Sequence, residues 1–203
     1  MARKQCILLL VCAAALAAAT AGRAARSAGW HTWWGSVSAA HGTYLLASRA
    51  PASPGETHSA LLTSPALSGD LAFAYTATTL RQLRTGSAPN PWEVAWSMFR
   101  FRDLENYYWF ILKPNGWELG KKQGSDRQIF LVTGSAPTLS VGQPNRIQIA
   151  TSGARIRVSV DGAPVVDYLD PSPLPAGGSI GLYEEDSSVR FQDLTLTSDG
   201  YHL

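Results

Sequence analysis

Residues 145–168, NRIQIATSGARIRVSVDGAPVVDY, contain short runs of alternating apolar and polar residues with turn signals between them. Ser152-Gly153 ends the first run, and Asp161-Gly162 ends the second. Successive side chains of a strand point to opposite faces, so this alternation predicts half-buried strands over residues 145–151, 154–160 and 164–167. Asp-Gly between two such runs favours a tight hairpin turn. The stretch therefore predicts consecutive antiparallel strands.

The same pattern extends over the chain from Trp30 onward, with no convincing helical periodicity. Strands are expected over 107–113 and 116–121, where Pro114-Asn115-Gly116 joins YYWFILK to WELGKK and Asn-Gly is again a strong turn signal. Further strands are expected over 33–38, 43–48, 59–64, 70–78, 92–102, 128–133, 178–184 and 188–197, with a longer loop over 80–91. We predict an all-β fold, a two-sheet antiparallel jelly-roll sandwich over residues 30–199.

The first residues, MARKQCILLLVCAAALAAATA (1–21), have the composition of a secretory signal peptide. Arg3 and Lys4 precede an apolar run from Cys6 to Ala19, and Ala19-Thr20-Ala21 fits the small-x-small cleavage pattern. The run is shorter than the roughly 20 apolar residues of a spanning helix. We therefore expect a signal peptide over 1–21, a short tether over 22–29, and a secreted domain with no membrane anchor.

Charge and cysteine content narrow the function classes. The chain has 17 Lys and Arg against 15 Asp and Glu, and a net charge of +2 is too small to indicate a nucleic-acid partner. Cleavage after residue 21 would remove two of the basic residues and both cysteines, Cys6 and Cys12. The exported chain is expected to be nearly neutral and to depend on its core rather than on disulfides.

The densest chemical feature lies between residues 92 and 122, where four of the seven tryptophans occur. Flat aromatic rings can cover the apolar C–H face of a sugar, and charged side chains can bond its hydroxyls. Alternation places Trp96, Arg100 and Arg102 on one side of the run 92–102, with Phe99 and Phe101 on the core side. We expect a concave saccharide-binding face whose candidate residues are Trp96, Arg100, Arg102, Tyr107, Trp109, Trp117 and Lys122. The alternative is that these aromatics fill the core.

Catalytic and metal-binding patterns are weaker. A glycosidase needs two carboxyl groups about 5–5.5 Å or 6.5–9.5 Å apart, but no E-x-D-x-E or E-x-D-x-x-E string is present. Glu118 and Glu185 are the candidate acid/base residues. The four histidines lack metal-ligand spacing. Calcium is the candidate cofactor, with Asp193 and Asp170 as candidate oxygen ligands.

About 130 residues resemble the concanavalin A-like sandwich proteins, especially the family-16-glycosidase-related and laminin-G-like groups and the 3-keto-disaccharide hydrolase domain. The stretches that carry the resemblance are FRFRDLENYYWFILKPNGWELGKK (99–122), VGQPNRIQIATSGARIRVSVDGAPVVDYLD (141–170) and GGSIGLYEEDSSVRFQDLTL (177–196). The D-F-E-L opening usual in the hydrolase domain is represented only by Asp70-Leu71-Ala72-Phe73. The resemblance implies the sandwich fold, which hosts enzymes, lectins and adhesion modules.

Together these features predict a secreted protein that binds a polysaccharide or oligosaccharide. The first alternative is a glycoside or 3-keto-glycoside hydrolase acting on oligosaccharides. The second is a laminin-G-like module that binds another protein through the same aromatic residues.

Overall fold

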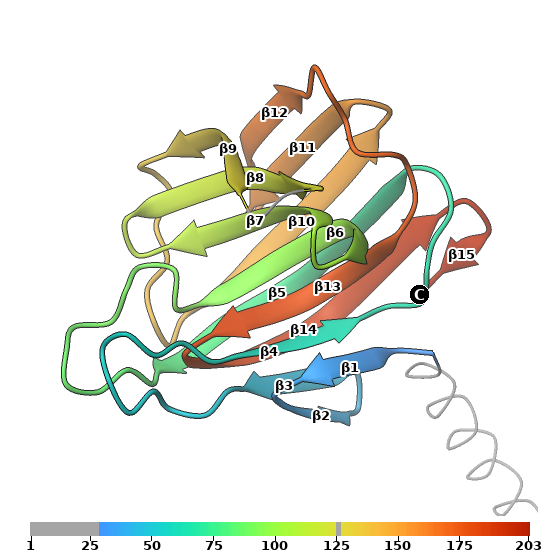
Figure 1. The fold of residues 1–203 in the computed structure, drawn as a ribbon. Coiled ribbons are helices and arrows are strands. Elements are labelled where there is room, and N and C mark those ends of the chain that lie inside the picture. Colours follow the sequence, from blue (N-terminus) through green and yellow to red (C-terminus); the bar gives the residue numbers. More distant parts are fainter. Residues whose placement is uncertain (1–28, 125–126) are drawn as a thin grey trace, which may run out of the picture.

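The computed structural model describes residues 29–124 and 127–203, and every regular element in these ranges is a strand (Figure 1). The predicted signal peptide, and the predicted tether up to residue 28, lie outside the described residues. In the described ranges, no helix has the length and apolar character needed to cross a membrane.

The strands form two antiparallel sheets. One has seven strands in the order β1 (His31–Trp34), β4 (Ser59–Thr63), β13 (Ser179–Glu185), β6 (Ala95–Asp103), β7 (Asn106–Lys113), β8 (Gly116–Gln123) and β9 (Gln128–Gly134). The other has eight, in the order β12 (Ala163–Leu169), β11 (Arg155–Val160), β10 (Pro144–Ser152), β5 (Leu71–Gln82), β14 (Ser187–Ser198), β3 (Thr43–Ala47) and β2 (Ser36–Ala40), with β15 (Tyr201–His202) paired to β14.

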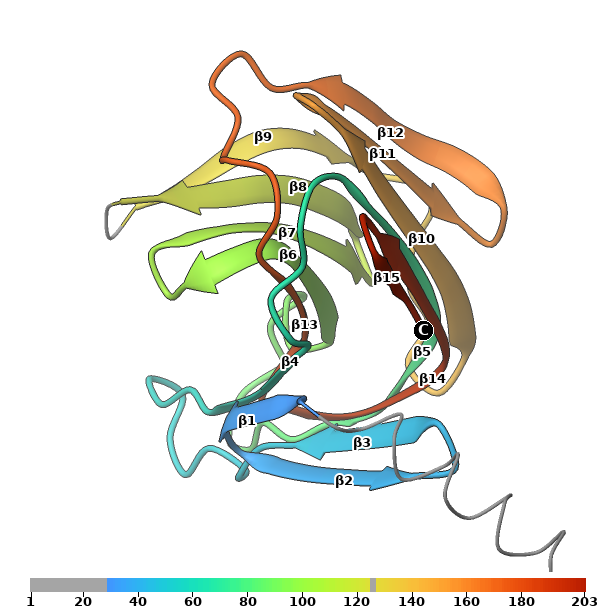
Figure 2. The ribbon, with the colours of Figure 1, turned by 90° about the vertical axis from the view of Figure 1, so that its right-hand side faces the viewer.

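The two sheets stack face to face, and the predicted all-β sandwich is confirmed (Figure 2). The middle strands of the seven-stranded sheet lie nearer to the other sheet than its edge strands do, so the outward side of this sheet is concave (Figure 2). Strands from the two ends of the sequence meet in both sheets. β13 lies between β4 and β6, and β14 lies between β3 and β5.

The core lies between the sheets and is built from the inward side chains of both. Phe99 of β6 stacks on Tyr108 of β7, with ring centroids 5.2 Å apart, and both side chains are fully buried. Across the core, the hydroxyl of Tyr75 on β5 is hydrogen-bonded to that of Ser97 on β6. Pairing these hydroxyls removes the cost of burying each of them alone.

The strongest turn signals were predicted correctly. Pro114 and Asn115 form the two-residue loop between β7 and β8. Asp161 and Gly162 join β11 to β12, both with positive φ (51° and 82°), as a type I′ hairpin turn requires.

Some element boundaries differ from the prediction. The predicted strand 33–38 is divided at Gly35, where φ is 77° and a Cβ would overlap Ala60 of β4. The structure also extends β5 to Gln82, inside the predicted loop, and adds β15 after the predicted last strand.

Candidate functional site

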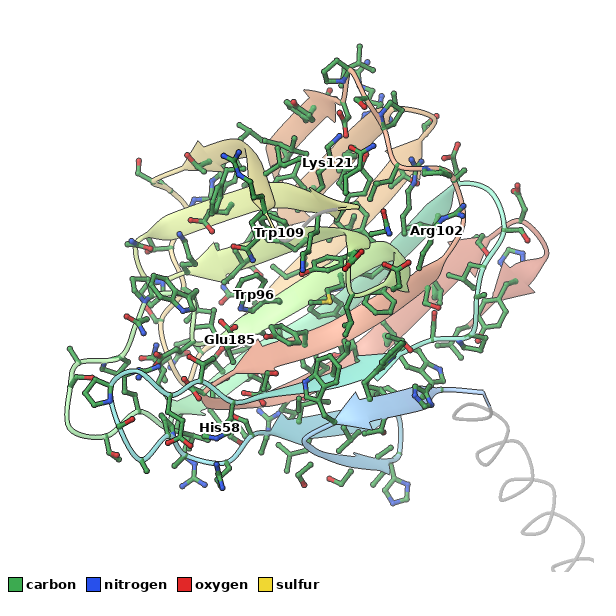
Figure 3. All side chains as sticks on the ribbon, viewed as in Figure 1. His58, Trp96, Arg102, Trp109, Lys121 and Glu185 are labelled. Atoms are coloured by element: carbon green, nitrogen blue, oxygen red, sulfur yellow. The ribbon has the colours of Figure 1, made fainter. Side chains whose placement is uncertain are left out.

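Aromatic side chains gather on the outward, concave side of the seven-stranded sheet. Since Ser97 and Phe99 point into the core, Trp96 and Met98 point outward from β6. By the same alternation, Tyr108 of β7 points into the core and Trp109 points outward. Figure 3 shows Trp96 and Trp109 on the neighbouring strands β6 and β7. We call this surface the aromatic face and define it by its rings: Trp33, Trp34, Trp96, Phe101, Tyr107, Trp109, Phe130 and Tyr183.

The rings form a continuous set of contacts across the sheet. From the β1 edge to the β9 edge, the centroid distances are 6.1 Å for Trp34–Trp33, 5.4 Å for Trp33–Phe101, 5.9 Å for Phe101–Tyr107, 6.3 Å for Tyr107–Trp109 and 5.8 Å for Trp109–Phe130. A branch runs from Trp109 to Trp96 at 6.4 Å and on to Tyr183 at 5.5 Å. These separations suit tilted and edge-to-face aromatic packing, so the rings hold one another in place.

Trp109 is the centre of this set, and a glycine makes its position possible. Its indole lies over Gly120 of β8, where a Cβ would overlap the ring. Trp109 is fully buried, and its indole N–H has no hydrogen-bond partner among the described residues. The centre of the aromatic face is therefore closed, while its margins are open: Trp33 is 39% exposed and Phe130 is 58% exposed.

Charged groups border the rings on β8. Lys122 lies opposite Tyr107, and Glu118 lies opposite Ile111, so both share the outward side with Trp109. The Glu118 carboxylate is paired with the Lys113 ammonium. The register thus places Trp96, Tyr107, Trp109 and Lys122 on the same side of the sheet.

The expected placement of Arg100 on this face is wrong. A bulge interrupts the pairing of β6 after Phe99, and Arg100 has a positive φ of 47°. The extra residue reverses the alternation, so Phe101 joins the outward side and Arg100 turns away from it. Its guanidinium, 2% exposed, bonds Asp70 at 2.9 Å and donates to the carbonyl oxygens of Gly153 and Leu174. The sequence FRFR (99–102) gives no indication of a bulge.

Arg102 and Trp117 also lie off the aromatic face. The Arg102 guanidinium donates to the carbonyl oxygen of Ala176, at the far end of β6 in Figure 3. Trp117 lies opposite Leu112 on the inward side, where its indole packs near Phe110 and donates to the carbonyl oxygen of Ala136. Trp117 is therefore a core residue, as the alternative interpretation of these aromatics expected.

Glu185 stands at the end of the aromatic face, next to Tyr183, whose hydroxyl donates to it at 3.0 Å. The Tyr183 hydroxyl also bonds Ser59, which accepts a hydrogen bond from the Trp34 indole at 2.8 Å. Burial raises the pKa of Glu185 to about 7, and the nearby carboxylates of Asp186 and Glu93 add to the rise. Glu185 is therefore a half-buried acid that is partly protonated near neutral pH.

The structure does not bring Glu185 close to the other candidate acid, Glu118. They lie on β13 and β8, with β6 and β7 between them. Strand spacing places their backbones about 14 Å apart, and their carboxylates contact different partners, Lys113 for Glu118 and the Tyr183 hydroxyl for Glu185.

The two candidate calcium ligands also lie apart. Asp170 follows β12 at one edge of the eight-stranded sheet, whereas Asp193 lies in a bulge of β14, about four strand spacings away. Both oxygens of Asp170 accept from Lys121 Nζ, at 2.9 and 3.1 Å, and one also accepts from the Tyr108 hydroxyl. Among the described residues, no group of three or more His, Cys, Asp and Glu side chains is arranged to hold a metal.

A buried charge cluster at one end of the sandwich had no signal in the sequence. Arg84 follows β5 and pairs with Glu93 and, at 2.7 Å, with Asp186. It also donates to the carbonyl oxygens of Pro54 and Glu56, at 2.9 and 3.3 Å, and so fastens the loop between β3 and β4 beside the end of the aromatic face. These partners are brought together only by the fold.

A hollow of about 460 Å³ lies on the opposite side of the molecule, over the outward face of the eight-stranded sheet. Its floor consists of small side chains such as Ala72, Ala74 and Ala150, with Arg157 and Asp167 at its border. It contains no exposed aromatic ring. The hollow and the aromatic face are thus separate surfaces with different chemistry.

Several solved structures share this architecture. The carbohydrate-binding module CBM66 from Bacillus subtilis superposes with a TM-score of 0.64 at 20% identity, over 84% of this chain and 96% of that chain. A Bacillus subtilis protein with a galectin-like fold gives 0.61 at 12% identity, over 83% and 89%. The exoplasmic/lumenal domain of VIP36 in its Ca²⁺-bound form gives 0.58 at 13% identity, over 83% of each chain.

No protein-family model matches the chain, and no curated protein matches it either. The likeness to solved structures establishes the fold: the chain is a concanavalin A-like β-sandwich, as its sequence predicted.

Proposed function

We propose that this protein binds a saccharide on the aromatic face. The observation that carries the proposal is the continuous set of rings on one outward, concave sheet surface, from Trp34 to Phe130. Aromatic rings buried for packing alone would not need to reach both edges of an outward-facing sheet. A sugar can place its C–H face on such rings and direct its hydroxyls to polar groups beside them.

The polar groups needed for the second role are present. Lys122 offers an ammonium next to Tyr107, and the Glu118–Lys113 pair lies further along β8 and β7, beyond Trp109. Glu185, with a pKa raised to about 7, can donate or accept a hydrogen bond near neutral pH. These groups could bond the hydroxyls of a neutral sugar without requiring a charged ligand.

The structural likeness to the carbohydrate-binding module CBM66 supports this proposal, since that module shares the fold over nearly its whole length. Likeness of fold is an analogy, and the residues of the aromatic face carry the argument.

The test is retention of the protein by insoluble polysaccharides, with Tyr107→Ala and Lys122→Ala compared with the wild-type protein. Arg190→Ala is the control, because Arg190 is exposed on β14 of the opposite sheet. We expect both face variants to lose retention and the control to keep it. Retention that persists in both face variants would overturn the proposal. Binding of a protein partner that free sugars do not displace would favour the adhesion alternative.

Hydrolysis of an oligosaccharide or keto-glycoside is a second candidate, favoured only by the raised pKa of Glu185. A general acid with such a pKa is well suited to protonate a leaving group. Turnover of a keto-glycoside panel that disappears in Glu185→Gln would support it, whereas absence of turnover in the wild-type protein would dismiss it.

We also propose that the protein is secreted, on the basis of residues 1–21. The N-terminal sequence of the mature protein tests this. A start at Gly22, or a few residues later, is expected, and an intact Met1 on the exported protein would refute cleavage.

A further inference from the structure

We infer that the aromatic face takes an extended saccharide chain lying across the strands, and not a single terminal sugar. The inference rests on the proposed function and specifies its ligand. It follows from which rings are accessible and from where the sheet places them.

Only part of the aromatic face can touch a ligand. Trp109 and Phe101 are buried, with 0% and 3% exposure, and serve as the support between accessible rings. The exposed rings are Trp33 at 39% and Phe130 at 58%, while Tyr107, Trp34 and Tyr183 are half-buried. Tyr107 lies between the two exposed rings in the set of ring contacts, and we call Trp33, Tyr107 and Phe130 the platforms.

The platforms follow one another on a line across the sheet. Trp33 is on the edge strand β1, Tyr107 on the interior strand β7, and Phe130 on the opposite edge strand β9. Through Phe101, the ring centroids of Trp33 and Tyr107 are at most about 11 Å apart, and through Trp109 those of Tyr107 and Phe130 are at most about 12 Å apart. A monosaccharide covers one platform and a disaccharide at most two neighbouring ones, whereas a longer chain can reach all three.

Each outer platform is held in a fixed orientation. The Trp33 indole donates to the Thr63 hydroxyl at 3.1 Å, and its ring meets Phe101 edge-on at 76°. Phe130 meets Trp109 at 90°. Rings already fixed in the free protein lose little conformational freedom on binding, which favours a ligand contact at each of them.

Polar side chains lie beside the line of platforms, near Tyr107 and near the β9 edge. Lys122 lies opposite Tyr107 on β8, and Gln128 lies opposite Lys122 on β9. A chain passing over Tyr107 toward Phe130 would therefore meet an ammonium and an amide beside its path. Once one contact along a chain has formed, each further contact is an intramolecular event, so several weak contacts together bind more tightly than any one of them alone.

The experiment is calorimetric titration of the full protein with linear cello-, xylo-, manno- and inulin-type oligosaccharides, each from disaccharide to octasaccharide. We expect the affinity for one series to rise with chain length. In that series, Trp33→Ala and Phe130→Ala should each lower the octasaccharide affinity by roughly 2- to 10-fold, the value of one aromatic contact, and at most one of them should affect the disaccharide.

Trp92→Ala is the matched control, because Trp92 is 44% exposed and its bond to the aromatic face comes from its backbone carbonyl oxygen, which accepts from the Trp96 indole and is kept in the variant. Thermal unfolding of each variant separates lost binding from lost folding. Equal affinity for disaccharide and octasaccharide, with no effect of either outer variant, would overturn this inference and leave the proposed function intact. Absence of binding to every series, together with no retention on polysaccharides, would overturn both.

Discussion

Replacing Lys121 by Met should destabilise the sandwich strongly, because it leaves a buried carboxylate without its cation. The side chains of Lys121 and Asp170 are 4% and 1% exposed, and Nζ lies 2.9 Å from the carboxylate. The same ammonium also donates to the carbonyl oxygen of Ser172, so it fastens the segment after β12 to β8. Lys→Met keeps the unbranched stem of the side chain and removes the terminal ammonium with its charge and hydrogen bonds.

Removal of one partner of a buried ion pair costs about 3–5 kcal/mol in the free energy of unfolding. For a domain of this size, 1 kcal/mol corresponds to about 2–4 °C, so the melting temperature should fall by roughly 6–20 °C. The Tyr108 hydroxyl and the Ser172 amide still bond Asp170 in the variant, at 2.6 and 2.9 Å, which places the expected loss toward the lower end of this range.

Thermal and urea unfolding measure this effect, with Arg155→Gln as the control. Arg155 pairs with Asp167 through two hydrogen bonds of 2.5 and 2.6 Å, but both side chains are about half exposed. Such a surface pair contributes about 0.2–1 kcal/mol. If Lys121→Met costs no more than Arg155→Gln, the reasoning about burial is wrong. The cost should also shrink in acid, because Lys121 holds the pKa of Asp170 low, and its loss allows that carboxyl to become neutral.

Three further effects are expected. Burial raises the pKa of Glu184 from 4.5 to about 7; the folded state therefore holds this proton more tightly than the unfolded state, and stability present below pH 4.5 should be lost as pH rises to about 7. Glu184 contributes about 3 kcal/mol to this loss, and Glu185 titrates in the same range, so in urea unfolding the loss should be smaller in Glu184→Gln than in the wild-type protein by about 3 kcal/mol; an equal loss in both proteins would contradict this. Gly120→Val should cost roughly 1–3 kcal/mol in thermal unfolding and change tryptophan fluorescence, because its side chain overlaps Trp109; unchanged values of both would contradict the packing described. Arg84→Met should cost about 3–5 kcal/mol, since it leaves two buried carboxylates without their cation, and a melting temperature like that of the wild-type protein would refute this.

Strand positions and turns were predictable from the sequence because local chemistry determines them. Alternation between residues 145 and 168, and the Asn-Gly and Asp-Gly pairs, need no information from distant residues. The same rule placed Trp96 and Trp109 correctly. It failed at Arg100, because one inserted residue in a bulge reverses every side chain after it.

The rest of the site depends on partners that only the fold brings together. Phe130 and Trp33 lie outside the tryptophan-rich stretch 92–122, so the sequence did not predict them as site residues, although they complete the aromatic face at its two edges. Arg84 lies nine residues from Glu93 but 102 from Asp186. No local sequence pattern predicts ion pairs between residues this far apart in the chain, and the numbers of acidic and basic residues are the same whether or not the groups are paired.

The insertion of β13 and β14 into the middle of the two sheets has a consequence for the order in which the chain can fold. Strand β4 is connected to β6 only through β13, and β3 is connected to β5 only through β14. These strands begin at Ser179 and Ser187, after every other described strand except β15. Neither sheet can be completed before β13 and β14 are available, whereas β6 to β9 and β10 to β12 pair with their neighbours in sequence and can form earlier. A protein shortened before Ser179 would leave the edges of β3, β4, β5 and β6 unpaired and open to mispairing and aggregation.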